Sequence, residues 1–183
     1  ADTERRTKLG VPAEITFATK PEIAVTQIQT ALAAGVPAGV VLADAAYGDE
    51  TGFRESITAL GLPYMVGIRL ATTVWAPGIE PLPPKPWSGR GTKPKRLRRG
   101  PGHEPIAVKT LALGLPPDQY QSVTWRDGTN AALTSRFTCL RVRPAHQSHL
   151  ATTMRPEEWL LIEWPQGDDE PAGYWLATAP SDA

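Results

Sequence analysis

The chain has 183 residues, a length that suits one domain or one domain with a large insertion. Hydrophobic residues make up 41% and charged residues 21% of the sequence, which excludes a disordered polar segment because there is enough apolar surface for a core. The 19 Lys and Arg balance the 19 Asp and Glu, so net charge gives no argument for a nucleic-acid or membrane surface. The 19 Pro and 16 Gly predict many turns and few long helices.

Cysteine content and the lack of a long apolar segment bear on the compartment. The single Cys139 excludes a disulfide within the chain and favours a reducing compartment. No apolar run approaches the roughly 18 residues that a membrane-spanning helix needs, and the charged start of the chain contains no hydrophobic leader. We therefore expect a cytoplasmic protein. Because the chain starts without Met in a polar stretch, we also expect a piece of a longer protein.

The first strongly predicted helix begins after Thr19. Thr19 and Glu22 have the spacing of a capping box, and Pro21 suits the first turn of a helix. Apolar residues then follow at helical spacing at Ala24, Ile28, Ala31 and Leu32. Gly35 is expected to end this helix. Upstream of it, residues 14–18 are a candidate strand.

A βαβ unit is predicted next. Residues 38–43 form a short apolar run of the kind found in a strand that is buried on both faces. Asp49 or Thr51 is expected to cap a second helix, which ends at Gly61. The apolar stripe of this helix consists of Phe53, Ile57 and Leu60. Residues 64–68 form the next strand, and strand-helix-strand order predicts parallel pairing.

From about residue 70 the helical period disappears and the sequence predicts β-structure. Runs at 122–126 and 135–142 flank Asp127 and Gly128, and this order predicts a hairpin. Runs at 159–164 and 174–178 form a second predicted pair. Residues 77–86 are rich in Pro and predict an exposed loop. All six tryptophans lie in this part and are most simply assigned to the core: Trp75, Trp87, Trp125, Trp159, Trp164 and Trp175.

Asp44 is the most informative candidate for chemistry. It follows the apolar run at 38–43, and open α/β sheets bind ligands at the carboxyl ends of their strands. A catalytic carboxylate here would be a ligand for Mg²⁺ or Mn²⁺, which need hard oxygen donors and usually more than one carboxylate. Asp49 could be a second ligand, although it is more simply a helix cap. Asp44 also has a structural alternative, because an Asp after a strand often caps the following turn or helix.

A basic run is the second candidate. Seven positive charges occur with no acidic residue between them, and Gly and Pro residues between them predict a flexible loop. These residues are Lys85, Arg90, Lys93, Lys95, Arg96, Arg98 and Arg99. Such a loop could hold DNA phosphates, with a steep dependence of affinity on salt. The alternative is a solvated basic loop that contacts nothing.

Two weaker signals are more simply structural. His146 and His149, with Cys139 upstream, invite a zinc interpretation, but a structural zinc site needs four ligands and the sequence supplies no complete set. Cys139 lies within an apolar strand run and is expected to be a small core residue rather than a nucleophile. Glycine-rich phosphate loops, nucleophile elbows and dinucleotide fingerprints are absent from the sequence.

The order of several short segments resembles that in the bacterial insertion-sequence transposases of the DDE superfamily. The segments are Gly10-Val11-Pro12, Lys20-Pro21-Glu22, Ala34-Gly35-Val36-Pro37, Ala43 to Asp49, Gly61-Leu62-Pro63-Tyr64, Trp125 to Thr129, Ser135-Arg136-Phe137, Arg141-Val142-Arg143 and Glu158 to Pro165. The resemblance spans nearly the whole chain. It implies an RNase H-like fold in which an Asp-Asp-Glu triad holds two divalent ions that hydrolyse transposon ends and join them to target DNA.

Within this resemblance, Asp44 matches the second carboxylate of the triad. The first Asp of the family lies upstream of Ala1, and the Glu, in a Tyr-x-x-Arg-x-x-x-Glu-like helix, lies downstream of Ala183. The expected fold class is therefore α/β: residues 1–70 form a partial RNase H-like core, and 71–183 form a β-rich insertion with a basic Pro/Gly-rich loop at 77–102.

Several functional expectations follow from the resemblance. It implies Mg²⁺ or Mn²⁺ as cofactor, DNA as partner, self-association of the full-length protein and a nucleoid-associated place in the cytoplasm. A chain with one triad carboxylate is expected to be inactive by itself. The strand at 38–43 would also have an exposed edge, which favours self-association or low solubility. The alternatives are a non-catalytic DNA-binding or interaction module, and an α/β domain with no role on DNA.

Overall fold

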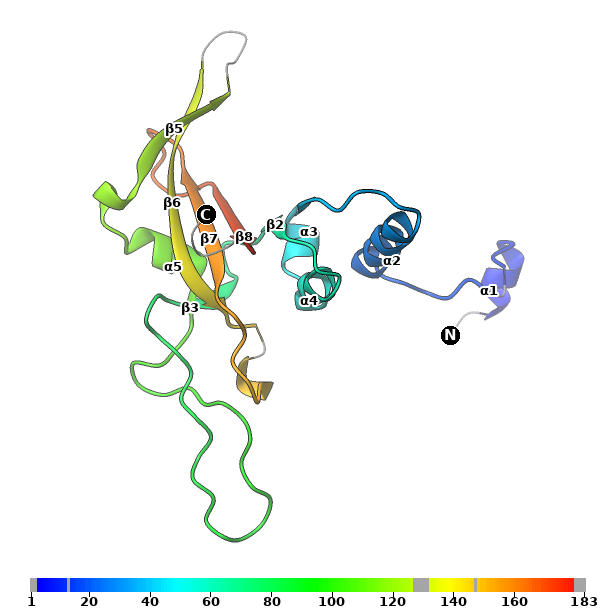
Figure 1. The fold of residues 1–183 in the computed structure, drawn as a ribbon, viewed down its shortest axis with the longest axis horizontal. Coiled ribbons are helices and arrows are strands. Elements are labelled where there is room, and N and C mark those ends of the chain that lie inside the picture. The colour runs from blue at the N-terminus through cyan, green and yellow to red at the C-terminus, as the bar shows by residue number, and fades with distance from the viewer. Residues whose placement is uncertain (1–2, 13, 127–131, 147, 180–183) are drawn as a thin grey trace. The chain divides into compact units, whose positions relative to one another are not determined.

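The computed structural model describes residues 3–12, 14–126, 132–146 and 148–179. These residues divide into two compact units, 1–37 and 38–183. Figure 1 shows the course of the chain through its helices and strands.

The first unit contains two helices, α1 (Thr3–Lys8) and α2 (Lys20–Ala33). The predicted capping box is confirmed: the Glu22 backbone N–H donates to Thr19 Oγ1 at 3.4 Å, and the Thr19 backbone N–H donates to a Glu22 carboxylate oxygen at 2.6 Å. Gly35 follows the helix with φ of +83°, the left-handed conformation that commonly ends a helix.

The prediction of a strand at 14–18 was wrong. These residues are not in a strand. The Ile15 carbonyl instead accepts a hydrogen bond from Arg6, and its N–H donates to Pro12 O in a turn. Ile15 and Phe17 are 53% and 88% exposed. The apolar pattern alone did not provide the neighbouring strand that a β-ladder needs.

The second unit opens with the βαβ unit that the sequence predicts. Its elements are β1 (Val41–Ala43), α3 (Ala45–Gly48), α4 (Thr51–Ala59) and β2 (Tyr64–Gly67). β1 and β2 pair in parallel, with Val41 opposite Tyr64. The predicted helix cap was wrong, because α4 has Glu50 at its N-cap, without a side-chain cap bond, rather than Asp49 or Thr51.

β1 also differs from the strand expected at 38–43. It is three residues long and lies at the end of the sheet order. Val40 and Leu42 are 60% and 73% exposed, so the strand is not buried on both faces. Its outer edge has no paired strand among the described residues, which agrees with the exposed edge that we expected.

One sheet combines this unit with the β-rich part of the chain. Its further strands are β3 (Thr73–Trp75), β4 (Ile106–Ala107), β5 (Gln121–Arg126), β6 (Leu133–Pro144), β7 (Glu158–Trp164) and β8 (Gly173–Ala177). The strand order is β1-β2-β8-β7-β6-β3-β4, with β5 also paired to β6. The remaining helices are α5 (Val108–Leu113) and two short 3₁₀ turns, Pro117–Gln119 and Ser148–Leu150.

Both predicted strand pairs are confirmed. β5 pairs with β6 and β7 with β8, each in antiparallel order. The predicted turn at Asp127 and Gly128 lies outside the described residues. β2 pairs directly with β8, so the sheet is continuous from the βαβ unit into the β-rich part. The division of the chain near residue 70 stays a prediction. The segment between β3 and β4 is a long loop that extends away from the sheet (Figure 1).

The core lies on one face of the sheet. The strand residues Val66, Leu160, Ile162 and Leu176 are fully buried, together with Ile57 of α4 and Val108 of α5. Alternation along β6 buries Thr138 and exposes its neighbour Cys139, so the assignment of Cys139 to the core was wrong. The assignment of all tryptophans to the core was also wrong: Trp75 is 1% exposed, but Trp87 and Trp125 are 52% and 55% exposed.

Candidate functional site

Asp44 lies where the sequence predicts it, immediately after the carboxyl end of β1. It is exposed and caps α3, with Oδ1 accepting a hydrogen bond from the Ala46 N–H at 2.9 Å. The capping role that was the structural alternative is therefore observed. The other carboxylate oxygen has no hydrogen-bond donor in the described part of the chain. Because Asp44 is exposed, this oxygen is the atom that could bind a ligand.

Two glycines hold the loop of Asp44 against β2. A Cβ on Gly48 would lie deep inside van der Waals contact with the Gly67 carbonyl oxygen, and 3.0 Å from both Gly67 C and Val66 Cβ. A Cβ on Gly67 would in turn lie 3.1 Å from the Ala45 nitrogen. The backbones of α3 and β2 therefore approach as closely as two glycines allow. This contact fixes the position of the Asp44 loop relative to β2.

Arg54 provides a further contact to the same loop. It projects from α4, is 4% exposed and donates a hydrogen bond to the Gly48 carbonyl and another, at 3.4 Å, to Thr51 Oγ1. The rings of Tyr47 and Phe53 also meet with their centroids 5.5 Å apart. Sequence analysis missed Arg54, because a single Arg in an amphipathic helix has the pattern of a surface residue.

Asp49 has a different role from either of those predicted. Its carboxylate pairs with the Arg69 guanidinium and accepts hydrogen bonds from the Arg69 N–H at 3.1 Å and from Thr72 Oγ1 at 2.7 Å. Burial alone would raise the pKa of Asp49, but these donors outweigh it and the pKa is lowered. Asp49 thus ties α3 to the segment after β2, and its oxygens are already engaged.

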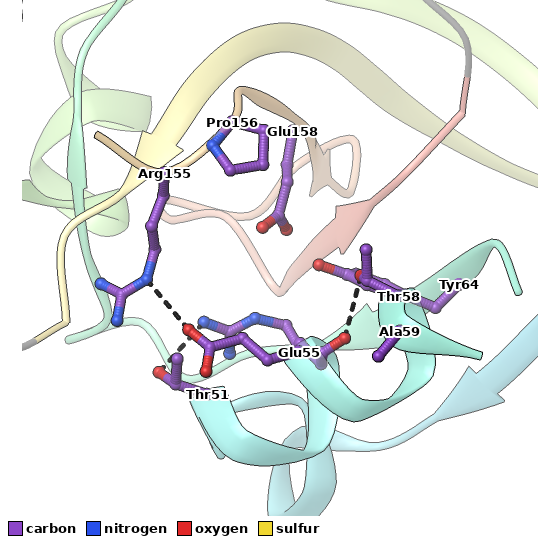
Figure 2. A pocket seen from close by; sticks show the side chains of 9 residues that line it. Thr51, Glu55, Thr58, Ala59, Tyr64, Arg155, Pro156 and Glu158 are labelled. Carbon is purple, nitrogen blue, oxygen red and sulfur yellow. Dashed lines mark hydrogen bonds and ion pairs between the residues drawn. The ribbon is translucent and has the colours of Figure 1, made fainter. Parts of the chain in front are cut away.

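A pocket of about 280 Å³ lies between α4 and the segment that enters β7 (Figure 2). Figure 2 shows the Glu158 carboxylate and the Tyr64 ring directed into it, with Arg155 and Glu55 paired at its mouth. Glu158 is 7% exposed, and its Oε2 has no hydrogen-bond partner. Burial raises the pKa of Glu158, and nearby Arg54 only partly opposes this. No pattern in the sequence distinguishes this buried Glu from a surface residue.

The basic residues all lie in the long loop between β3 and β4. Lys85, Lys93, Lys95, Arg96 and Arg98 line an open groove of about 530 Å³. Within the described ranges, Lys85, Arg90, Lys93, Lys95 and Arg96 are exposed and have no acidic partner.

Two arginines of this loop have structural contacts. Arg98 Nε donates to Pro83 O at 2.9 Å, and the backbones of Leu82 and Arg98 also pair. Arg99 donates to the buried Ser148 Oγ at 3.0 Å. These contacts anchor the base of the loop, whereas the cations without acidic partners lie farther along it.

The residues of the zinc interpretation are not brought together. Among the residues that the structure describes, no group of three or more His, Cys, Asp and Glu side chains could hold a metal ion. His146 is exposed, and nothing is described of the His149 side chain. Cys139 lies in an apolar groove with Met65, Trp159 and Leu161, where burial raises the pKa of its thiol.

A protein-family model described as DDE superfamily endonuclease matches residues 1–132. The chain belongs to the DDE superfamily of endonucleases. The match includes β1, Asp44, the α3 loop and the whole basic loop. No curated protein matches the chain. The chemistry of this family is of the nuclease or transposase type, acts on DNA and typically uses a divalent metal. None of the helices in the described ranges is long and apolar enough to cross a membrane.

The described residues of this DDE-superfamily chain fit only part of the family's metal site. The free oxygen of Asp44 is a hard donor of the kind that Mg²⁺ and Mn²⁺ prefer. Asp49 is engaged by Arg69 and Thr72, and no set of three metal-binding side chains occurs among the described residues. A two-metal centre needs ligands for both ions, so Asp44 can supply one ligand but not the whole site.

Proposed function

We propose that this chain is the central part of a DDE transposase and that Asp44 is the second carboxylate of its metal-binding triad. The family chemistry is hydrolysis of phosphodiester bonds at transposon ends, followed by strand transfer into target DNA. The observation that supports this assignment most strongly is the position of Asp44. An exposed carboxylate with one free oxygen follows a parallel strand, on a loop held by Gly48, Gly67 and Arg54.

The isolated chain should not cleave DNA, because the described residues supply one ligand of a two-metal site. The test is incubation of supercoiled plasmid with the purified chain and Mg²⁺ or Mn²⁺, with Asp44→Asn as the matched variant. We expect no nicking by either protein. Metal-dependent nicking that Asp44→Asn abolishes would refute the incomplete site while supporting Asp44 as a ligand, and nicking that survives in Asp44→Asn would refute its role.

We further propose that the basic loop contacts DNA phosphates. Lys85, Arg90, Lys93, Lys95 and Arg96 keep their charges free of acidic partners within the described ranges, and all of them except Arg90 line the open groove. Lys93→Ala with Arg96→Ala is the most specific variant. It leaves Arg98 in place, because Arg98 also holds the loop to Pro83 and its loss could change the loop's conformation. Fluorescence anisotropy with duplex DNA should show a weaker affinity in this double variant. Lys8→Ala with Lys20→Ala removes the same charge from the other unit and should leave affinity unchanged.

A non-catalytic DNA-binding or interaction module is the alternative, and the lack of a three-ligand cluster among the described residues favours it. Such a module would bind DNA equally well in EDTA and in Mg²⁺, and Asp44→Asn would change neither affinity. The transposase assignment predicts that a protein with this chain and all three triad carboxylates cleaves transposon ends and loses that activity in Asp44→Asn.

Self-association is proposed through the exposed edge of β1. Val40 and Leu42 present apolar side chains beside unpaired backbone groups, which is a template for pairing with another strand. Sedimentation velocity should therefore show concentration-dependent association. Leu42→Lys should reduce that association, because a charge on an edge strand disfavours strand addition. A sharp monomer at all concentrations in the unchanged chain would contradict this proposal.

A further inference from the structure

Arg54 and Glu158 are the two charged residues that are at least nine-tenths buried in the described part of the chain. They come from α4 and from the start of β7, and both line the pocket of about 280 Å³ between these elements. No direct ion pair joins them within the described ranges. Burial of two separated charges costs stability. Stability alone therefore does not explain why both charged side chains are buried.

Arg54 acts on the loop of Asp44 through the Gly48 carbonyl. That carbonyl is at the C-terminal end of the single turn α3, where it has no partner within the helix. The same turn begins at Asp44, whose backbone carbonyl accepts the N–H groups of Tyr47 and Gly48 at 3.1 and 2.9 Å. A charged donor at the C-terminus of the turn also opposes the partial negative charge there. Arg54 thus holds the far end of the short turn that Asp44 caps.

Glu158 acts on Arg54 by charge. Arg54 of α4, the Tyr64 hydroxyl of β2, Arg155 before β7 and Arg141 of β6 all act on the pKa of this carboxylate, and the first three line the same pocket. Arg155 is engaged by Glu55, and Arg141 by Glu157. The guanidinium of Arg54 is the buried cation among them, and an uncompensated buried cation would favour conformations that expose it to solvent. A carboxylate in the same pocket opposes that tendency when it is ionised, and so keeps the guanidinium beside Gly48.

We propose that Arg54 and Glu158 are positioning residues for Asp44: Arg54 fixes the Gly48 carbonyl, and Glu158 keeps Arg54 in place. The pair couples β7, in the β-rich part of the sheet, to the loop that contains the candidate metal ligand. The functional meaning of this coupling rests on the proposed function of Asp44. The coupling itself is a property of the fold and can be tested separately.

Amide hydrogen exchange resolved by residue tests the coupling. The reporters are the N–H groups of Tyr47 and Gly48, which donate to the Asp44 carbonyl, and of Asp49, which donates to the Ala45 carbonyl. Arg54→Met leaves a buried carbonyl without its donor, so local exchange should accelerate about tenfold. Glu158→Gln should accelerate it several-fold, and Arg54→Met with Glu158→Gln should be no faster than Arg54→Met alone. Arg141→Met removes another Arg whose charge acts on Glu158 but whose partners are Glu157 and Trp159, and should leave these amides unchanged.

Two results would overturn the proposal at this stage. Additive acceleration in the double variant would mean that Glu158 does not act through Arg54. Equal acceleration of amides in the centre of β7 would mean that the variants loosen the whole sheet rather than the Asp44 turn. Arg54→Lys keeps the charge with one donor group and should restore part of the lost protection, so the measurement remains informative if Arg54→Met folds poorly.

Paramagnetic broadening by Mn²⁺ separates positioning from a purely structural role. If Asp44 is a ligand, Mn²⁺ should broaden the Ala46 amide in the unchanged chain and not in Asp44→Asn. Arg54→Met and Glu158→Gln should both reduce that broadening, whereas unchanged broadening would refute the positioning role. Absence of broadening in the unchanged chain would mean that Asp44 does not hold Mn²⁺ without further ligands, and the exchange data alone would then decide whether the pair holds the turn.

Discussion

Gly48→Ala is the substitution whose effect follows most directly from the structure. The added Cβ would overlap the Gly67 carbonyl oxygen and would also lie 3.0 Å from Gly67 C and Val66 Cβ. These are backbone atoms or atoms next to the backbone in a fully buried strand region, so they cannot rotate away. The α3 turn must therefore move off β2 by about 1 Å. Overpacking of this kind costs about 1 to 3 kcal/mol, which for a unit of this size lowers Tm by roughly 3 to 10 °C.

Gly52→Ala is the matched control for this change. It makes the same chemical substitution four residues later, in the first turn of α4, where the new Cβ would meet nothing within 4 Å. Helix propensity there favours Ala over Gly by about 0.5 to 1 kcal/mol. Thermal unfolding followed by circular dichroism should therefore shift downward for Gly48→Ala and stay level or rise for Gly52→Ala. A Gly48→Ala chain as stable as the unchanged one would refute the close approach of α3 and β2.

Three further predictions concern charges and caps. Because the pKa of Asp49 is lowered from 3.8 in the folded chain, its ion pair stabilises the fold above that pH and is lost as the pH falls through the lowered value. Asp49→Asn should thus cost about 0.5 to 1 kcal/mol at neutral pH, since Arg69 is exposed and screened, and nothing at strongly acidic pH in urea unfolding. Because the pKa of Glu158 is raised from 4.5, its contribution is present below that pH and lost as the pH rises through the raised value. Stability of Glu158→Gln relative to the unchanged chain should therefore increase from pH 4.5 upward, and a flat difference would contradict the burial of an ionising carboxylate. Thr19→Ala should cost α2 about 1 kcal/mol and lower the helical signal in circular dichroism, whereas Thr26→Ala removes a hydroxyl in mid-helix and should leave the cap intact.

Local sequence patterns were sufficient to predict the helices and strands that are long enough to show a periodic pattern. The capping box before Lys20 fixed the start of α2, and alternation around the predicted turn fixed the pairing of β5 with β6. The turn α3 could not be predicted in this way, because four residues are too few to show a helical period. The run at 14–18 had strand composition but not the partner strand that stabilises one.

The candidate site was predictable only where it depends on local order. Asp44 could be predicted from its place after an apolar run, and the exposed basic loop from charges without acidic neighbours. Arg54 and Glu158 did not stand out, since contacts between distant segments, rather than local sequence, bury them. The same reason explains Gly48 and Gly67, whose function depends on the approach of one backbone to another.

The dependence of DNA affinity on salt tests the central claim, that this DDE-superfamily chain holds DNA with the loop between β3 and β4. Affinity should be measured by anisotropy from low to physiological salt for the unchanged chain, Lys93→Ala with Arg96→Ala, and Lys8→Ala with Lys20→Ala. Each lost phosphate contact lowers the magnitude of the slope of log K against log salt by about 0.9. We predict a slope smaller by about 2 for the loop variant and an unchanged slope for the control. Identical slopes for all three proteins would contradict the claim.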